Sequence, residues 1–564
     1  MKVTKHFVTV GQRRVHFHRA GEGPTVALLH ASPCSAKVLR LPLEVFATRF
    51  TAIAFDTPGF GLSDLLPLEQ PETEDLADAL AQTLSALGIE HAAAYGRHTG
   101  AQIAVEFAAR HPQRCAMALA DGFPLFSSEG KKARLERYLQ PLLPTFDGAH
   151  LLWLWFRYRE QHVFWPWNEQ RAANRADSDV PDADFLHRGV IELLEAGDGY
   201  RIGYATAFRH RGLDVLPDLK VPVCFGVRPG DSLFRTLPQY PAGTWTMEMP
   251  REAPAAARAE LDVLAKHPAR GAAPCAPACA PLPGRSTTDY VDVAHGQILV
   301  RSSGRLDAAP PVVLIHHAPG SSALYDALVC AIGKHHPAIA FDLPGHGESD
   351  ASPRMPQSVE AWTSALLELL DKLSIGPVHL YGHNGGAAVA VEAGLRAGKR
   401  VRSLVLDAPV CLGEGETEIA ARWLDGVEPL QSTWNGEHLI RAWHMRRDME
   451  LWWPWYERRR ANARNVEPRI EPARLTVELR ETMKQPASFA PAWRAVMTYP
   501  LSRRLAQSKQ AACLMAAPQD VFARCLPLAQ AARSDARIFE VQDTAESRAQ
   551  AILHGIFQEL EVKT

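Results

Sequence analysis

Short apolar runs, each bounded by turn-forming residues, recur along the first half of the chain. The runs that we expect to be strands lie at 5–10, 14–19, 25–29, 51–55 and 92–95. Helical periodicity marks the stretches 72–87 and 101–110 between and after them. Continuous apolar runs of this length are typical of strands buried on both faces of a mostly parallel sheet. The alternation predicts a doubly wound α/β domain.

The second half of the chain repeats this pattern. Residues 54–61 and 340–347 share an Asp-x-Pro-Gly-x-Gly motif at a shift of 286 positions. Further along, Trp165-Pro166-Trp167 reappears as Trp453-Pro454-Trp455 at a shift of 288 positions. A nearly constant shift over more than a hundred residues indicates a duplicated unit. We therefore expect two tandem α/β domains, each with a mostly parallel sheet.

The boundary between the two copies is marked by composition. Prolines and alanines without apolar periodicity fill 272–283, as is common in linkers. We expect a first domain at 1–268, a linker at 269–284 and a second domain at 285–564. Each domain has an insertion that we expect to form a helical cap, at about 127–212 and about 412–500.

Composition and charge narrow the classes of partner. The 564 residues are 46% hydrophobic and 22% charged, with a formal net charge of −2, so we expect no nucleic-acid partner. No apolar stretch is long enough for a membrane helix, and the first residues lack the apolar core of a secretion signal. The nine cysteines are an odd number scattered along the chain, which does not indicate a disulfide framework. We expect a cytoplasmic protein without metal or cofactor, in which Cys275 and Cys279 do not form a zinc site.

A Gly-x-x-x-Gly turn follows the fifth expected strand in each copy and leads into a helix. It reads Gly96-Arg97-His98-Thr99-Gly100 in the first copy and Gly382-His383-Asn384-Gly385-Gly386 in the second. Upstream lie His30-Ala31-Ser32-Pro33 and His316-His317-Ala318-Pro319, followed by the two Asp-x-Pro-Gly-x-Gly motifs. In this order the motifs resemble those of the α/β-hydrolase superfamily, most closely its capped branch of dehalogenases, epoxide hydrolases and C–C bond hydrolases. The turn has the spacing of the nucleophile elbow of that family.

The resemblance implies an oxyanion hole in each copy. In the family, one backbone N–H comes from the His-Gly-x-Pro loop and another from the residue after the nucleophile. By position these groups belong to Ser32 and Thr99, and to Ala318 and Gly385 in the second copy. Ala31 and His317 replace the usual glycine. The side chains beside these groups are further binding candidates, namely His30, Arg97, His316, His317 and His383.

Both copies depart from the family at the reactive residues. The elbow holds His98 in one copy and Asn384 in the other, where the family has a nucleophile. The loops after the last expected strands, at 250–252 and 542–544, lack the general-base histidine that the family places there. We do not expect His267 or His554, which lie further on, to reach the site.

Candidate acids remain near both elbows. Asp231 and Asp520 lie where many relatives keep their acid, and Asp121 and Asp407 end the preceding strand, an acid position in some dehalogenases. Aspartates at such places also cap helices or close turns, and both interpretations stay open. We expect His98 to be the central group of the first copy, oriented by Asp121.

The cap sequences are rich in tryptophan, which predicts an apolar pocket with few polar anchors. Cap pocket candidates are Trp155, Arg159, Trp165, Trp167, Trp443, Arg447, Trp453 and Trp455. Arg159 and Arg447 occupy matching positions, each followed by an acid. They either bind a substrate carboxylate or, as we prefer, pair with an acid to fix two cap helices. The tryptophans could equally pack between caps.

Three hypotheses about function follow. The first is an enzyme that acts on a small, largely apolar carbonyl compound by non-serine chemistry, with His98 at the elbow. The second is a pseudo-hydrolase that binds a small molecule or serves as a scaffold. The third, compatible with both, is that the duplication reproduces an ancestral dimer within the chain, with further oligomerisation open.

Overall fold

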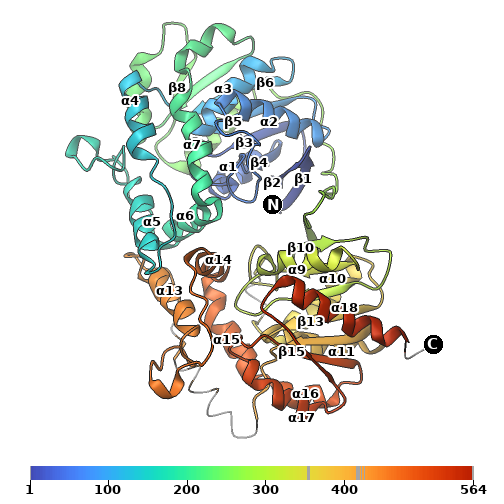
Figure 1. The fold of residues 1–564 in the computed structure, drawn as a ribbon. Coiled ribbons are helices and arrows are strands. Elements are labelled where there is room, and N and C mark those ends of the chain that lie inside the picture. The colour runs from blue at the N-terminus through green and yellow to red at the C-terminus, as the bar shows by residue number, and fades with distance from the viewer. Residues whose placement is uncertain are drawn as a thin grey trace. The chain divides into compact units, whose positions relative to one another are not determined.

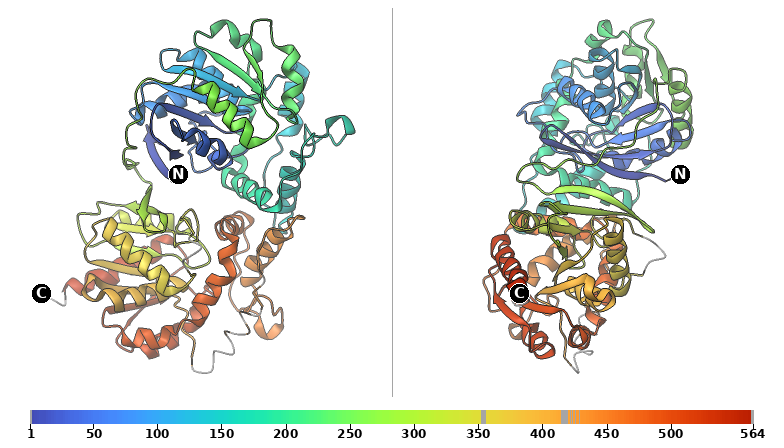
Figure 2. Two further views of the ribbon diagram at one scale, coloured as in Figure 1. Left: turned by 180° about the vertical axis from the view of Figure 1, so that it is seen from behind. Right: turned by 90° about the vertical axis from the view of Figure 1, so that its right-hand side faces the viewer.

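The computed structural model describes residues 2–351, 356–413, 420, 422, 424, 426–427 and 429–561 (Figure 1). Its contacts divide the chain into two compact units. The first comprises Met1–Leu143 and His150–Ala280, and the second comprises Pro144–Ala149 and Pro281–Thr564. Each unit folds around its own sheet, blue to green in the first and yellow to red in the second (Figure 2).

The sheet of the first unit has the strand order β1-β2-β4-β3-β5-β6-β7-β8. Strands β1 and β2 pair antiparallel and β2 pairs antiparallel with β4, whereas the remaining neighbours are parallel. The strands are β1 (Thr4–Val10), β2 (Arg13–Ala20), β3 (Thr25–Leu29), β4 (Thr51–Phe55), β5 (Ala92–Arg97), β6 (Cys115–Asp121), β7 (Val223–Val227) and β8 (Thr246–Glu248). The predicted α/β class is confirmed.

Helices cover both faces of this sheet, which explains the continuous apolar runs. Leu29 and Ile53 pack into a core with Phe107, whereas the adjacent Leu28 and Ala54 belong to a core with Phe46. Successive side chains of one strand thus enter opposite cores. The helices of this core domain are α1 (Arg40–Phe46), α2 (Thr73–Ala86), α3 (Thr99–Arg110) and α8 (Ala253–Leu264). The cap between β6 and β7 contains α4 (Ser128–Ala133), α5 (Ala149–Glu160), α6 (Ala183–Ala196) and α7 (Tyr200–Arg209).

The second unit repeats the topology, with the order β16-β15-β14-β13-β11-β12-β10-β9. Its strands are β9 (Thr287–Val293), β10 (Gly296–Ser303), β11 (Val312–Ile315), β12 (Ala338–Phe341), β13 (Val378–His383), β14 (Val401–Asp407), β15 (Ala511–Ala516) and β16 (Arg537–Glu540). Its core helices are α9 (Asp326–Gly333), α10 (Val359–Lys372), α11 (Gly385–Ala397), α17 (Leu526–Ala532) and α18 (Ala545–Glu561). The cap helices within the described residues include α13 (Glu437–Met449), α14 (Pro472–Met483), α15 (Phe489–Thr498) and α16 (Leu501–Gln507).

The Pro/Ala-rich segment between the copies lies against the first sheet. Arg19 of β2 donates to the carbonyl of Pro274 at 2.5 Å, and the Thr9 hydroxyl of β1 donates to that of Ala280 at 2.6 Å. Pro24 and Ala272 form an isolated antiparallel bridge. These bonds attach the segment to the first unit along part of its length. None of the described helices is both long and apolar enough to span a membrane.

Candidate functional site

Each unit has a sharp turn where its fifth strand meets the following helix. His98 links β5 to α3 with φ 50° and ψ −112°, and Asn384 links β13 to α11 with φ 48° and ψ −113°. Non-glycine residues rarely adopt positive φ, and such strain is concentrated at functional sites. The two turns therefore have the backbone geometry of the elbow that the motif predicted.

The flanking glycines are required by close backbone approach. A Cβ on Gly96 would lie 1.9 Å from the carbonyl oxygen of Gly100, and one on Gly100 would lie 2.1 Å from that of Leu29. The second elbow is equally tight, since a Cβ on Gly386 would lie 2.3 Å from the carbonyl oxygen of Ile315. Any side chain at these positions would push the helix away from the sheet.

In the first unit the elbow histidine is held by an aspartate. His98 Nε2 lies 2.7 Å from Asp231 Oδ2, and the other Asp231 oxygen accepts from the backbone N–H of Leu233 at 2.9 Å. Asp231 therefore both caps a short helix and orients the histidine, so the two interpretations open in the sequence hold together. Burial opposes ionisation, but His98 keeps the pKa of the Asp231 carboxyl well below its ordinary value. The His98 side chain remains 34% exposed.

Asp121 does not orient the His98 ring, and that expectation is wrong. Its Oδ2 accepts from Arg228 at 2.8 Å, and only its backbone carbonyl meets the histidine, by accepting from the His98 N–H. Arg228 also donates to the buried Glu260 at 2.6 Å. Burial, reinforced by Asp121, raises the pKa of Glu260 to about 7. This cluster beneath the elbow is held by an arginine and leaves Asp231 as the partner of the ring.

The oxyanion loop of the first unit contacts the start of α3. The N–H of Ser32 donates to the Thr99 hydroxyl at 3.4 Å, so the two residues expected to form the hole face each other. His30 is buried, and its Nε2 accepts from the N–H of Thr57 at 3.0 Å. Its other ring nitrogen contacts the carbonyl of Ala31. His30 thus orients the loop, while Arg97 lies 3.7 Å from Asp121.

In the second unit a histidine one position earlier takes the aspartate. His383 Nε2 lies 2.8 Å from Asp520 Oδ2, and the Asn384 amide donates to the other Asp520 oxygen at 3.2 Å and to the carbonyl of Ala408 at 2.9 Å. Asp520 also accepts from the N–H of Phe522 at 2.8 Å, as Asp231 does in its helix cap. Although burial raises it, the hydrogen bond from His383 lowers the pKa of Asp520 overall. Asn384 itself offers no nucleophile.

Both ring nitrogens of His383 are occupied. Its Nδ1 lies 2.6 Å from the Tyr325 hydroxyl, which lies 2.8 Å from Nδ1 of His317 and 3.2 Å from the His317 N–H. With Asp520 accepting from His383 Nε2–H, the tyrosine donates to His383 and accepts from His317. Hydrogen bonds link Asp520, His383, Tyr325 and His317 in this order, and we call these four residues the floor of the second site. Burial, together with Arg446, lowers the pKa of His317 well below its ordinary value, so it is neutral.

The remaining oxyanion candidates of the second unit match those of the first. His316 is buried and accepts from the N–H of Leu343 at 2.9 Å, as His30 does from Thr57. Ala318 and Gly385 line a cavity of about 540 Å³ with His317, His383 and Asn384. Asp407 does not line this cavity. It is buried and accepts hydrogen bonds from Tyr381 and Arg548, each at 2.7 Å.

The loops that lack the family's base histidine carry charged residues that bind the cap. In the first unit Arg251 donates to Asp177 at 2.7 Å, and in the second Asp543 accepts from Arg469 and Arg548. The core residue is basic in one unit and acidic in the other, so the polarity of this contact is reversed. His267 packs against Trp245, and His554 packs against Phe539, as rings remote from the elbows.

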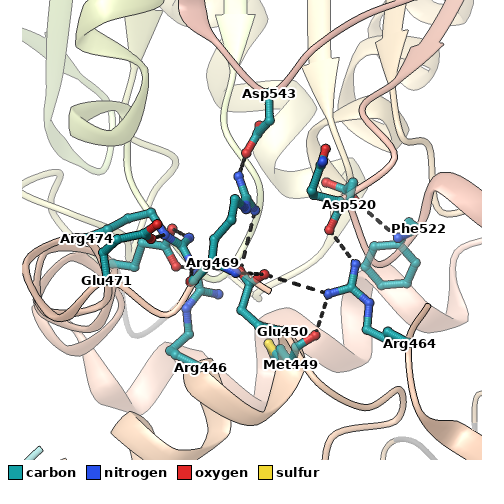
Figure 3. A network of polar contacts seen from close by, with 12 residues as sticks. Arg446, Met449, Glu450, Arg464, Arg469, Glu471, Arg474, Asp520, Phe522 and Asp543 are labelled. Atoms are coloured by element: carbon teal, nitrogen blue, oxygen red, sulfur yellow. Dashed lines mark hydrogen bonds and ion pairs between the residues drawn. The ribbon is translucent and has the colours of Figure 1, made fainter. Parts of the chain in front are cut away.

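The cavity of the second unit has a charged wall that the sequence reading missed. Arg446, Arg464, Arg469 and Arg474 come from its cap and Arg548 from α18, together with Glu450 and Glu478 (Figure 3). Trp493, Val496 and Phe522 supply apolar surface. The expectation of few polar anchors therefore does not hold for this cavity. Arg446 and Arg474 lie on α13 and α14 and Arg464 and Arg469 on the segment between them, so no spacing motif marks them, although Arg446 directly precedes the candidate Arg447.

The cap candidates mostly serve packing. Trp155 and Trp443 are buried, and Trp165 and Trp167 lie 5.6 and 6.0 Å from the Tyr138 ring. Trp453 and Trp455 stack near Trp493, at 6.2 and 5.6 Å, behind the cavity wall.

The two arginines of the matched cap pairs contact their own neighbours. Arg159 lies 3.2 Å from Glu160 and Arg447 lies 3.4 Å from Asp448, so each pair lies within one helix. These two ion pairs do not themselves join two cap helices. Arg458 from the segment after α13 does bind Asp448, at 2.6 Å.

Within the described part of the chain, no group of three or more histidine, cysteine or acidic residues is arranged to hold a metal ion. Cys275 is exposed and Cys279 is buried.

Comparison with known proteins adds a family to this geometry. Residues 27–185 and 310–426, one segment in each half, match the family model described as the alpha/beta hydrolase fold. The chain is 36% identical over 120 residues to the dihydrolipoyllysine-residue acetyltransferase component of an acetoin cleaving system of Pseudomonas putida, covering 21% of this chain and 31% of that protein. It is 32% identical over 126 residues to a 2-hydroxy-6-oxo-2,4-heptadienoate hydrolase of Pseudomonas putida, covering 22% and 45%.

The chain thus spans less than half the length of these curated relatives. Among solved structures, an enol-lactonase from Burkholderia xenovorans aligns with a TM-score of 0.36 and 21% identity, covering 48% of this chain and 98% of that chain.

Proposed function

The chain belongs to the alpha/beta hydrolase fold family, and on this premise we propose that its first unit hydrolyses a small carbonyl compound with a histidine base in place of a serine nucleophile. The observation that carries the proposal is the 2.7 Å contact between His98 and Asp231 at the elbow. Most members of this fold are enzymes, but fold alone does not assign a reaction.

The contact with Asp231 fixes the tautomer of the ring. An ionised carboxylate only accepts, so His98 Nε2 carries the proton and Nδ1 has a free lone pair. Among the described residues no hydrogen-bond partner of Nδ1 is found, and the side chain is 34% exposed. A neutral imidazole with one nitrogen held and one nitrogen open has the arrangement of a general base.

The reaction proceeds without a covalent enzyme intermediate. His98 Nδ1 takes a proton from water as the water oxygen bonds to the carbonyl carbon, and the carbonyl oxygen becomes an oxyanion. The N–H of Thr99 stabilises that charge, joined by the N–H of Ser32 once it leaves its 3.4 Å contact with the Thr99 hydroxyl. When the tetrahedral species collapses, the bond to the leaving group breaks and the imidazolium returns its proton to that group. Asp231 stabilises the imidazolium throughout.

The first cap has an aromatic core, which favours an apolar substrate body. Tyr138, Tyr204 and Phe208 are buried there and their rings lie 5.2 to 5.7 Å apart. Hydrolases of enol-containing keto acids are among the relatives, which supports esters, lactones and cleavable diketones as the substrate class to test.

The test is a hydrolysis screen over small esters, lactones and diketones with wild type and His98→Ala. We expect His98→Ala to lower kcat by about 10²–10⁴-fold, the usual contribution of a general base. Added imidazole should restore part of the loss, which a purely structural defect would not allow. His111→Ala is the matched control, since His111 also pairs with an aspartate, Asp78, at 2.7 Å on the surface. Equal rates for wild type and His98→Ala would refute the proposal.

A second candidate is a pseudo-hydrolase that binds without turnover, and it is favoured in the second unit. Asn384 stands at that elbow, and both nitrogens of the adjacent His383 are occupied. A binding function for the second unit is compatible with catalysis in the first.

A further inference from the structure

The second unit has a closed floor and a cationic cap around one cavity. Its volume of about 540 Å³ lies in the range of small-molecule sites. The elbow of the second unit has no free base or nucleophile, because His383 is bonded on both sides and Asn384 replaces the nucleophile. His317 Nε2 has no partner among the described residues, but burial lowers the pKa of His317 well below its ordinary value, which makes it a weak base. The question is therefore which ligand the wall would hold.

Several cap arginines share the same carboxylate. Glu450 is the common partner of Arg474, Arg469 and Arg464, at 2.8, 3.5 and 3.9 Å. Glu478 is shared by Arg446, at 2.6 Å, and Arg474. Each of the four cap guanidinium groups thus meets Glu450, Glu478 or both, and Arg469 also meets Asp543. Figure 3 shows how they converge around Glu450.

The neighbouring acids offset much of this positive charge, but none of those in the described part of the chain lies closer than 3.9 Å to Arg464. Asp543 is divided between Arg469 and Arg548, and Arg548 also meets the buried Asp407. Glu471 lies 3.4 Å from Arg474 but is 67% exposed, so solvent screens its charge. Asp520 is hydrogen-bonded to His383 and keeps its negative charge, which acts on Arg464 from beyond ion-pair distance.

Arg464 is the least compensated of the group. Its side chain is only 9% exposed, its nearest carboxylate is 3.9 Å away, and it donates to the backbone carbonyls of Met449 and Gln519. A buried guanidinium without a close counter-ion is costly, and an anion beside it would remove that cost. The Nε atoms of Arg446 and Arg469 are also buried without an acceptor among the described residues.

Apolar surface adjoins these charges. Trp493 and Phe522 are 8% and 2% exposed, and their ring centroids lie 6.4 Å apart in the cavity wall. The indole N–H of Trp493 has no acceptor in the described structure. A ligand that suits this wall has an apolar body and one oxyanion group.

We propose that the cavity of the second unit binds a small organic anion, with its carboxylate or phosphate at Arg464 and Arg446 and its apolar body against Trp493, and does not transform it. Guanidinium groups bind both kinds of oxyanion through paired N–H donors. This site is separate from the reaction proposed at His98.

The test is calorimetric titration of the full chain with benzoate, phenyl phosphate and the neutral isostere benzamide. We expect saturable binding of at least one anion, with benzamide weaker by about tenfold or more, as loss of a charge-assisted bond requires. The two anions distinguish a carboxylate from a phosphate ligand. Arg464→Gln should weaken anion binding by about tenfold, whereas Arg441→Gln on the same cap should change it by less than about twofold.

Arg441 is a fair control because it is 45% exposed and pairs with Glu437 at 3.1 Å on the helix surface. Circular dichroism checks that each variant is folded, and Arg446→Gln replaces Arg464→Gln if the latter is not. Equal affinity for benzoate and benzamide, or wild-type affinity in the arginine variant, would overturn the proposal, as would the absence of saturable binding by either anion. Titration measures binding without turnover, so its result does not depend on whether His98 catalyses hydrolysis.

Discussion

The two units share one topology and place a histidine beside an aspartate at the elbow, but the histidine stands at different positions. His98 occupies the elbow itself and keeps one ring nitrogen open, with 34% of its side chain exposed. His383 stands one residue earlier, is 13% exposed, and is bonded by Tyr325 on one side and Asp520 on the other. A shift of one position along a tight turn thus separates an available base from a locked one.

Tyr325 is the residue that occupies the second ring nitrogen of His383. Its counterpart in the first unit is the buried Leu39, which has no hydroxyl to engage a histidine. Both residues end a short 3₁₀ helix after the oxyanion loop, at 36–39 and 322–325. The floor of the second site therefore requires both the histidine at position 383 and the hydroxyl of Tyr325.

The largest expected effect is on turnover, where we compare the elbow aspartate Asp231 with the surface aspartate Asp78. Asp231→Asn should lower kcat by about 10²–10⁴-fold, because an amide no longer fixes the protonated nitrogen of His98 or stabilises its charged form. The measurement is steady-state hydrolysis with a substrate found in the screen. Asp78→Asn, which alters the surface pair with His111, should leave kcat unchanged. A full rate in Asp231→Asn would show that the elbow pair does not act in the reaction.

Reactivity of the two histidines should differ by a smaller factor. Acylation by diethyl pyrocarbonate needs an unprotonated, accessible ring nitrogen, so we expect His98 to react at least about tenfold faster than His383. Peptide mass spectrometry of the partly modified chain gives both rates. Tyr325→Phe frees Nδ1 of His383 and should raise its rate toward that of His98. If both histidines already react alike in wild type, the distinction between an open and a locked base is wrong.

Acid stability should be alike in the two units. The pKa values of Asp231 and Asp520 are lowered on folding, so each contributes stability above the ordinary value of 3.8 that is lost as the pH falls through the lowered value. Asp231→Asn and Asp520→Asn should each reduce the free energy of unfolding by about 1–3 kcal/mol at pH 7, where the hydrogen bond to a charged group is lost.

Urea denaturation at several pH values measures this effect. The difference from wild type should be constant between about pH 7 and pH 5 and shrink below pH 3.8. A difference that grows toward low pH would contradict the sign of the shift.

The fold was readable because its signals are local. Apolar runs such as 51–55 and the glycines around His98 depend on burial and on backbone approach within one turn. Because the sequence repeats, the same elements could be assigned in the second unit. The elbow residues and their candidate acids followed from spacing in the same way.

The pairing of those residues was not readable, because it depends on side-chain reach across strands. Sequence order made Asp121 as good a partner for His98 as Asp231, but Arg228 occupies Asp121 in the fold. Tyr325 lies outside every motif, and the cap arginines come from two helices and the segment between them. The formal net charge of −2 also gives no sign of the five arginines that gather at one cavity.

The smallest effect concerns the loops where the base histidine is missing. Asp543 is 20% exposed and is shared by Arg469 and Arg548, whereas Asp177 is 82% exposed and meets Arg251 alone. Removing a partly buried carboxylate leaves two guanidinium groups without it, so Asp543→Asn should lower the free energy of unfolding by about 1–3 kcal/mol. Asp177→Asn should cause no measurable change, because solvent screens an exposed pair. Thermal denaturation of both variants decides the matter. Equal losses of unfolding free energy in the two variants would mean that the two core-to-cap contacts are equally strong. Burial of Asp543 would then add nothing to the stability of the second cap.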